Sequence, residues 1–127
     1  MKSYMYLPGV IILLISLFVI SCNEDENTFC NNSCNVSDPV KDLAWLKNDI
    51  EEIEQNNNDY SEYAFYMTAM FKGETVFFYG NCHPAINYVS FLLTCNGDTL
   101  GYTEELYDHL NTVTLLWQHE ESECNFD

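Results

Sequence analysis

The sequence predicts an α+β fold, in which one N-terminal amphipathic helix packs on an antiparallel sheet of about five strands with disulfide support. Three patterns lead to this prediction. Apolar residues first recur with the helical period, and they then alternate with the strand period around two short turns. Six cysteines in 127 residues add possible cross-links. The folded domain is expected to cover residues 38–127.

The helix is expected to begin at Asp38-Pro39. Asp is a favoured N-cap, and Pro lacks only an N–H that the first helical turn leaves unpaired. The apolar positions that follow form one stripe of Val40, Leu43, Leu46, Ile50 and Ile53. Asn56–Asn58 is expected to end the helix in a left-handed cap.

The first hairpin is predicted to join Tyr63–Phe71 and Glu74–Tyr79 around the turn Lys72-Gly73. Such a turn pairs Phe71 with Glu74. The face expected beneath the helix carries Phe65, Met67, Ala69, Phe71, Val76 and Phe78. The opposite face, which is rich in hydroxyl groups, is expected to tolerate water.

A second hairpin is predicted from Ile86–Cys95 and Thr99–Tyr102, because they flank Asn96-Gly97, a strong turn signal. Its expected core face holds Val89, Phe91, Leu93, Leu100 and Tyr102. Thr103 is then expected to cap a short helix with Glu104 and Glu105 in its first turn. The last predicted strand is Thr112–Gln118, with its inward residues Val113, Leu115 and Trp117.

Residues 1–21 have the pattern of a signal peptide. One lysine precedes an apolar run, Val10–Ile20, that only Ser16 interrupts and whose length as a helix is about 16 Å. A bilayer core is about 30 Å thick, so this run is short for a membrane span. Val19-Ile20-Ser21-Cys22 resembles the lipobox of bacterial lipoproteins, which implies cleavage before Cys22 and acylation of that cysteine.

Residues 22–37 are expected to form an acylated acidic tether. Asn23–Asn27, which carries three acidic residues, resembles the export signal of Bacteroidota-type surface lipoproteins. The resemblance implies an outer-membrane, lipid-anchored protein at the cell surface. The alternative interpretation of this charged run is a solvated linker.

The charge balance limits the partners. Four lysines stand against 20 acidic residues, for a net charge of −16. Phosphate repels such a chain, so nucleic-acid binding is not expected. Anionic lipid surfaces repel it as well, so membrane attachment is expected only through the lipid anchor.

The cysteines other than Cys22 can oxidise outside the cytoplasm. Five thiols allow two disulfides in many pairings. The favoured pairing joins Cys82 to Cys95 across the second hairpin, and Cys124 to Cys34 or Cys30, with one thiol left over. Retention of several reduced thiols is the alternative.

The sequence has no G-x-S-x-G motif, no phosphate-binding glycine loop and no H-E-x-x-H pair, so no catalytic residue, metal or cofactor is assigned. His83 follows Cys82, but adjacency alone does not make a catalytic pair. His109 and His119 are expected to be solvated rather than metal-bound. Asp98-Thr99-Leu100 resembles a three-residue O-glycosylation acceptor.

Trp45 is the candidate partner-binding residue. On a helical wheel it lies about 140° from the centre of the apolar stripe. Either the tether covers it, or it is an exposed anchor for a partner. Glu51, Glu52 and Glu54 crowd the C-terminal turns, where the helix dipole disfavours anions, so they are either tolerated surface or a patch for a cationic partner.

Three segments together resemble a family of small, functionally uncharacterised Bacteroidota-type lipoproteins. The segments are a D-P-x-x-D-L-x-W-L-K helix at 38–47, a G-x-x-V-F strand at 73–77 and a cysteine turn at 95–98. The resemblance implies no activity and supplies no catalytic residues.

The expected function is therefore that of a lipid-anchored binding or interaction module, not an enzyme, with an unidentified protein or envelope component as partner. The first alternative is an inhibitor or immunity-type protein that blocks a cationic protein, because negative charge would steer such a partner to it. The second alternative is a hydrolase with an unrecognised site.

Overall fold

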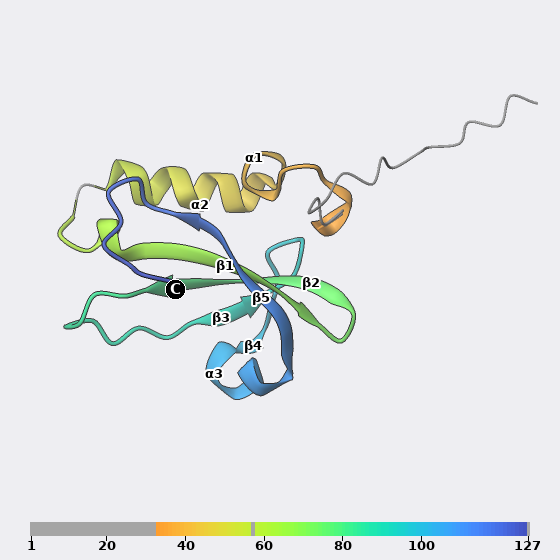
Figure 1. Ribbon diagram of the computed structural model, residues 1–127. Coiled ribbons are helices and arrows are strands. Elements are labelled where there is room, and N and C mark those ends of the chain that lie inside the picture. The colour runs from red at the N-terminus through yellow and green to blue at the C-terminus, as the bar shows by residue number, and fades with distance from the viewer. Residues whose placement is uncertain (1–32, 57, 127) are drawn as a thin grey trace, which may run out of the picture.

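The computed structural model describes residues 33–56 and 58–126, which form one antiparallel five-stranded sheet with helices (Figure 1). The strand order is β4-β3-β2-β1-β5. The strands are β1 Ala64–Phe71, β2 Glu74–Asn81, β3 Phe91–Leu93, β4 Thr99–Tyr102 and β5 Leu110–Gln118. The predicted α+β class and sheet are confirmed. The predicted signal peptide, the acidic run, Cys22 and Cys30 lie outside the described residues.

Two helices occupy the segment for which one was expected, α1 Pro39–Asp42 and α2 Ala44–Gln55. Leu43 separates them in an extended conformation (φ −87°, ψ 105°). Asp38 is the N-cap of α1 but makes no side-chain capping bond, because its carboxylate pairs with Lys41 at 2.6 Å. Asn56 caps α2 with φ −79°, so it is not itself left-handed, and Asn57 lies outside the described residues.

The first hairpin has the predicted register. β1 and β2 pair Phe71 with Glu74 and Met67 with Phe78. The two turn residues, Lys72 and Gly73, both have positive φ, as a tight hairpin turn of this twist requires.

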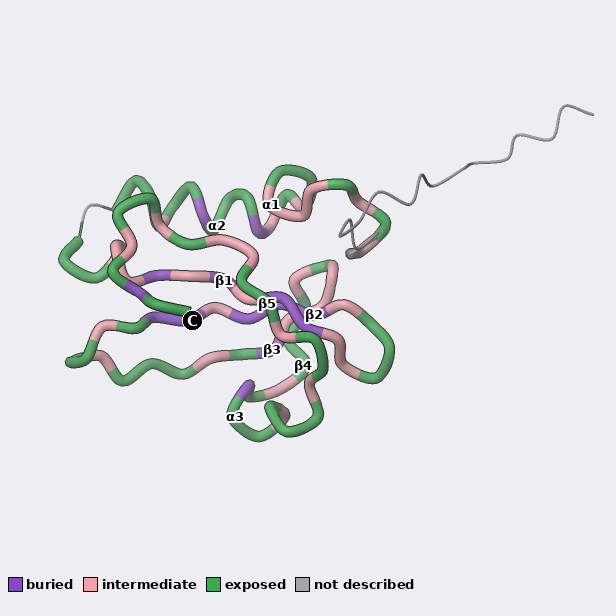
Figure 2. The backbone as a smooth tube through the Cα atoms, viewed as in Figure 1, coloured by how far each residue is buried: buried purple, intermediate pink, exposed green. Residues whose placement is uncertain are grey.

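The expectation for the two faces of this hairpin is reversed. α2 packs on the face that carries Tyr66 and Phe77, where Leu46 and Ile50 complete a buried cluster. The other face is also covered: Ala69, Val76, Phe78 and Leu92 form a second cluster against Leu106 of α3 (Thr103–Leu106) and against β5. Figures 1 and 2 show α2 and α3 on opposite sides of the sheet, with buried residues between them. Because both faces are apolar, alternation alone could not identify the face that meets α2.

The second hairpin is shorter than predicted. β3 holds only three residues, and Ile86–Ser90 is not a strand. A register shift lies between Leu92 and Leu93, and Leu92 is fully buried. Four of the five residues predicted for the core face are exposed instead: Val89, Phe91, Leu100 and Tyr102.

The helix cap and the last strand also differ from the prediction. Thr103 is the first residue of α3 rather than its cap, and its hydroxyl lies 3.0 Å from that of Ser90. β5 pairs with β1 through two register shifts, and Thr112 has a φ of 53° within it. These irregularities break the simple alternation, so Leu115 is exposed while Leu116 and Trp117 pack toward the α2 cluster.

Two disulfides cross-link the fold, but the predicted pairing is wrong. The bonds join Cys34 to Cys95 and Cys82 to Cys124. Cys95 lies beside the start of β2, where its Sγ is 3.8 Å from the Thr75 carbonyl oxygen, and Cys82 follows the end of that strand. The length of β2 therefore separates Cys82 from Cys95, and each pairs with a cysteine from another segment, Cys124 or Cys34.

Candidate functional site

A groove opens between the C-terminal half of α2 and the segment that leads into β3. We call it the α2–β3 groove; its volume is about 540 Å³. Its lining comprises Asp49, Glu52, Ile53, Asn56, Asn58, Tyr60, Ser61, Tyr66, Tyr79, Asn81, Ile86, Tyr88, Val89, Ser90, Phe91, Leu93 and Thr99. A volume of this size is within the range of ordinary ligand sites.

The groove exists because the sheet outside β2 is incomplete. β2 and β3 pair at one position, Phe77 with Leu93. The chain before β3 therefore leaves the sheet and forms a wall of its own. α2 buries Leu46 and Ile50 against the β1–β2 side of the sheet and leaves the helix-side surface of β3 uncovered.

Three tyrosines form a continuous aromatic surface in the groove. Tyr66 and Tyr79 meet edge to face with ring centroids 5.7 Å apart, and Tyr79 meets Tyr88 in the same way at 5.9 Å. Asn81 fixes the Tyr79 hydroxyl by donating to it from Nδ2 at 3.2 Å. The row runs from the surface into the core, since Tyr88 is exposed and Tyr66 is only 3% exposed.

Asp49 links the helix to this aromatic surface. The Tyr66 hydroxyl donates to Asp49 Oδ2 at 2.5 Å. Burial, followed by this bond to the carboxylate, raises the pKa of Tyr66 far above its usual range, so the phenol remains a donor. The bond holds the carboxylate at the edge of the groove.

The charged groups of the groove are all of one sign. Asp49 and Glu52 line it, and no lysine does so among the described residues. The ion pairs in that part of the chain lie elsewhere, Lys41 with Asp38 and Lys47 with Glu51. The groove is therefore apolar and aromatic with a negative rim.

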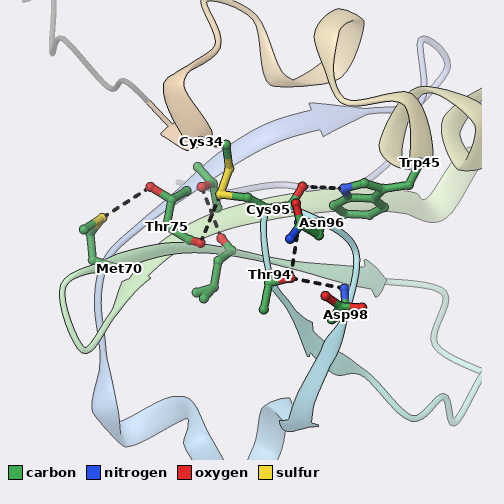
Figure 3. Close-up of a disulfide and its surroundings, with 10 residues drawn as sticks. Cys34, Trp45, Met70, Thr75, Thr94, Cys95, Asn96 and Asp98 are labelled. Atoms are coloured by element: carbon green, nitrogen blue, oxygen red, sulfur yellow. Dashed lines mark hydrogen bonds between the residues drawn. A yellow bond between two sulfur atoms is a disulfide. The ribbon is translucent and has the colours of Figure 1, made fainter.

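Trp45 lies on the sheet side of α2, not away from it. Its indole N–H donates to the Cys95 carbonyl oxygen at 2.9 Å (Figure 3). Its ring meets Phe77 edge to face, with the ring centroids 5.8 Å apart. Trp45 and Ile50 both belong to α2, so the wheel angle between them is unchanged. Trp45 lies in the first turn of α2, and its long side chain reaches the β3–β4 turn instead of solvent. The β3–β4 turn covers Trp45, because a Cβ added to Gly97 would lie 2.9 Å from Trp45 Cγ.

The three predicted glutamates do not act as one patch with Trp45. Glu51, Glu52 and Glu54 are all exposed on α2. Glu51 faces Lys47 at 3.8 Å, and Glu52 alone lines the groove. The structure therefore brings Glu52 together with Asp49, which the sequence did not single out.

The histidines are not gathered. His83 lies between Tyr60 and Tyr63, with ring centroids 4.9 and 4.7 Å away, and its Nδ1 accepts from the Ala85 N–H. No group of three possible metal ligands of the His, Cys, Asp or Glu type occurs among the residues that the structure describes.

The aromatic row was missed at the sequence level for a definable reason. Tyr66 and Tyr79 lie on the hairpin face assigned to water, and Tyr88 was read as part of a strand. A signal was present, since three tyrosines on one face of neighbouring segments is more aromatic surface than a solvated face normally has.

Comparison with known proteins identifies no relatives: no family model, no curated protein and no solved structure matches this chain. Within the described residues, no helix has both the length and the apolar character needed to cross a bilayer. The chemistry of the α2–β3 groove is therefore the basis for a functional proposal.

Proposed function

We propose that this protein is a lipid-anchored binding module of the outer membrane, exposed at the cell surface, and that its ligand occupies the α2–β3 groove. Cys22 would carry the lipid, as its lipobox-like context implies. The observation that supports binding is the groove itself, an open cavity of about 540 Å³ with an ordered aromatic wall. It depends on no contribution from another chain.

The position of the first disulfide supports this arrangement. Cys34, near the C-terminal end of the proposed tether, is bonded to Cys95 in the β3–β4 turn. Part of the groove lining, which includes Asn56, Asn58 and Asn81, lies toward the other end of α2. Figure 1 shows these two ends on opposite sides of the molecule. An anchor attached through Cys34 would thus leave the groove directed away from the membrane.

A second candidate function is inhibition of a cationic protein, and the negative rim of the groove favours it. Asp49 and Glu52 lie where a bound protein would contact them. Both candidates use the same site, and they differ in whether the partner loses its own activity when it is bound.

The anchor is tested by Cys22→Ala. The substitution should abolish metabolic labelling with palmitate and leave the signal peptide uncleaved. Protease treatment of intact cells should degrade the unaltered protein and spare a periplasmic marker. Labelling that survives the substitution would overturn the anchor, and protection from protease would overturn surface exposure alone.

The groove is tested by site-specific photo-crosslinking in the producing cell. A photoreactive phenylalanine analogue at Tyr88 should give adducts, and adding Phe91→Ala should reduce them. The control places the analogue at Thr114, which is exposed on β5 outside the groove. Equal adducts at the two positions would contradict a groove-directed ligand.

A further inference from the structure

We infer that the ligand of the α2–β3 groove is a basic polypeptide segment, held by a lysine or arginine side chain. This inference rests on the proposed function and names the chemistry of the ligand. The stem of that side chain would lie along the tyrosine row, and its charge would lie at Asp49 and Glu52. Three independent features of the groove lead to this conclusion.

The first feature is uncompensated negative charge beside aromatic rings. Asp49 and Glu52 have no lysine partner in the described chain, while Asp38 and Glu51 each have one. A cation placed within about 6 Å of a tyrosine ring is attracted by the ring as well as by the carboxylates. A neutral or anionic ligand would gain neither interaction.

The second feature is exposed apolar surface next to those charges. Val89 is 66% exposed, Phe91 is 42% exposed and Tyr88 is 38% exposed, and all three line the groove. Lysine and arginine carry a long methylene stem below the charge, so they match an apolar wall that leads to a carboxylate. A metal ion or a small ammonium ion would leave this wall in water.

The third feature is the edge of the sheet. β4 is the outermost strand on this side, and its Thr99 lines the groove. An extended segment that pairs with an exposed strand edge directs alternate side chains to one face of the sheet. A segment beside β4 would direct one set of side chains toward the α2 side, which favours a polypeptide over an isolated amine.

Charge argues against two other occupants. A second copy of this chain would bring another net charge of −16 to an acidic surface. The segment Asn23–Asn27 of the same chain holds Glu24, Asp25 and Glu26, which would meet Asp49 and Glu52 with like charge. A basic segment from another protein is the complementary partner.

The test uses full-length protein, processed in a bacterial host and solubilised in a nonionic detergent. Three fluorescein-labelled peptides of sequence Thr-Val-X-Val-X-Val-Thr, with X as lysine, glutamine or glutamate, are titrated and followed by fluorescence anisotropy. The lysine peptide should bind at least tenfold more tightly than the glutamine peptide. Its affinity should fall as NaCl is raised, because the attraction is ionic.

Matched variants locate the interaction. Asp49→Asn combined with Glu52→Gln should weaken binding of the lysine peptide about tenfold and abolish its preference over the glutamine peptide. Glu51→Gln removes one negative charge from the same helix outside the groove and should leave the affinity unchanged. Circular dichroism and Trp fluorescence establish that each variant is folded.

The outcomes separate this inference from the proposed function. Equal binding of the lysine and glutamine peptides, with loss on Phe91→Ala, overturns the cationic ligand and leaves the groove as a binding site. Equal weakening by Glu51→Gln overturns it as well, because the attraction would then be diffuse. Binding of none of the peptides also overturns the inference, and the crosslinks from Tyr88 still decide the proposed function.

Discussion

At the scale of single residues, two contacts show how α2 is placed on the sheet. The Trp45 indole lies over Gly97 and donates to the carbonyl of Cys95, so the helix is bonded to the turn that Asn96-Gly97 forms. Further along, the Tyr66 hydroxyl reaches Asp49. Both contacts join a large ring to a backbone or carboxylate oxygen, and together they fix the rotation of α2 about its axis.

Gly97 is required for two reasons that substitution can separate. Its φ is +83°, and a Cβ there would meet Trp45. Gly73 has a similar φ of +85° with nothing within 4 Å of an added Cβ. Gly73→Ala should therefore cost only the left-handed backbone penalty of about 1–2 kcal/mol. Gly97→Ala should lower the free energy of unfolding, measured in urea, by more than Gly73→Ala does. An equal loss in the two variants would show that Trp45 does not press on the turn.

The Tyr66 hydroxyl should make stability depend on alkaline pH. An unfolded tyrosine has a pKa of about 10, and folding raises the pKa of Tyr66. The folded state therefore binds this proton more tightly, so its contribution is complete below pH 10 and is lost as the pH rises above that value.

The substitution Tyr66→Phe tests this contribution. At pH 7 it should cost about 1.5–3 kcal/mol, the usual net value of a hydrogen bond to a charged group. Between pH 9.5 and 11 the variant should lose less unfolding free energy than the unaltered protein does. The exposed Tyr107→Phe serves as control, and parallel losses in all three proteins would contradict the assignment.

At the scale of elements, short-range signals predicted more than periodicity did. The Lys72-Gly73 turn fixes the pairing of β1 with β2, because a two-residue turn leaves one register, and that register is found. Which face meets α2 was not fixed, because Phe77 and Phe78 are both buried on opposite sides. The alternation in β5 failed between Leu115 and Trp117, where the pairing with β1 shifts register.

The groove could be predicted only in fragments. Glu52 was named from its place near the end of a helix, and the exposed aromatic residues were recognised as apolar, but both were assigned to other surroundings. Their convergence depends on how α2 packs on the sheet and on the short β3, both of which are set by tertiary packing. Local sequence carries no information on how far apart such elements lie.

The disulfides belong to the same scale, since each ties a segment outside the sheet, at Cys34 or Cys124, to the sheet or its turns. Their loops span separations of 61 and 42 residues. In the chain-entropy model, each such loop contributes about 4 kcal/mol. Cys34→Ser with Cys95→Ser, and Cys82→Ser with Cys124→Ser, should therefore each lower the unfolding free energy substantially.

Peptide mapping without reduction checks the pairing directly. It should recover Cys34 linked to Cys95 and Cys82 linked to Cys124 from protein isolated from the cell envelope. Recovery of a peptide that links Cys82 to Cys95 would contradict the structure, because those residues lie beyond opposite ends of β2.

At the scale of the whole molecule, charge opposes folding. The chain has 4 basic and 20 acidic residues, and its described lysines are Lys41, Lys47 and Lys72. So large an excess of one sign destabilises a compact state through self-repulsion. Added salt screens such repulsion over about 10 Å at 0.1 M and over shorter distances at higher concentration.

The melting temperature should accordingly rise with salt. Between 20 and 500 mM NaCl we expect an increase of about 2–6 °C, since a gain of well under 1 kcal/mol in unfolding free energy shifts the melting temperature of a domain of this size by several degrees.

Glu52→Gln with Glu54→Gln removes two anions near the C-terminal end of α2, where the helix dipole disfavours them. This variant should melt higher at 20 mM NaCl and gain less from added salt. Asp38→Asn should instead lower the melting temperature at 20 mM NaCl. The reason is that Lys41 pairs with the Asp38 carboxylate and lowers its pKa, so this anion stabilises the fold. A melting temperature that falls with salt would mean that specific ion pairs outweigh the general repulsion.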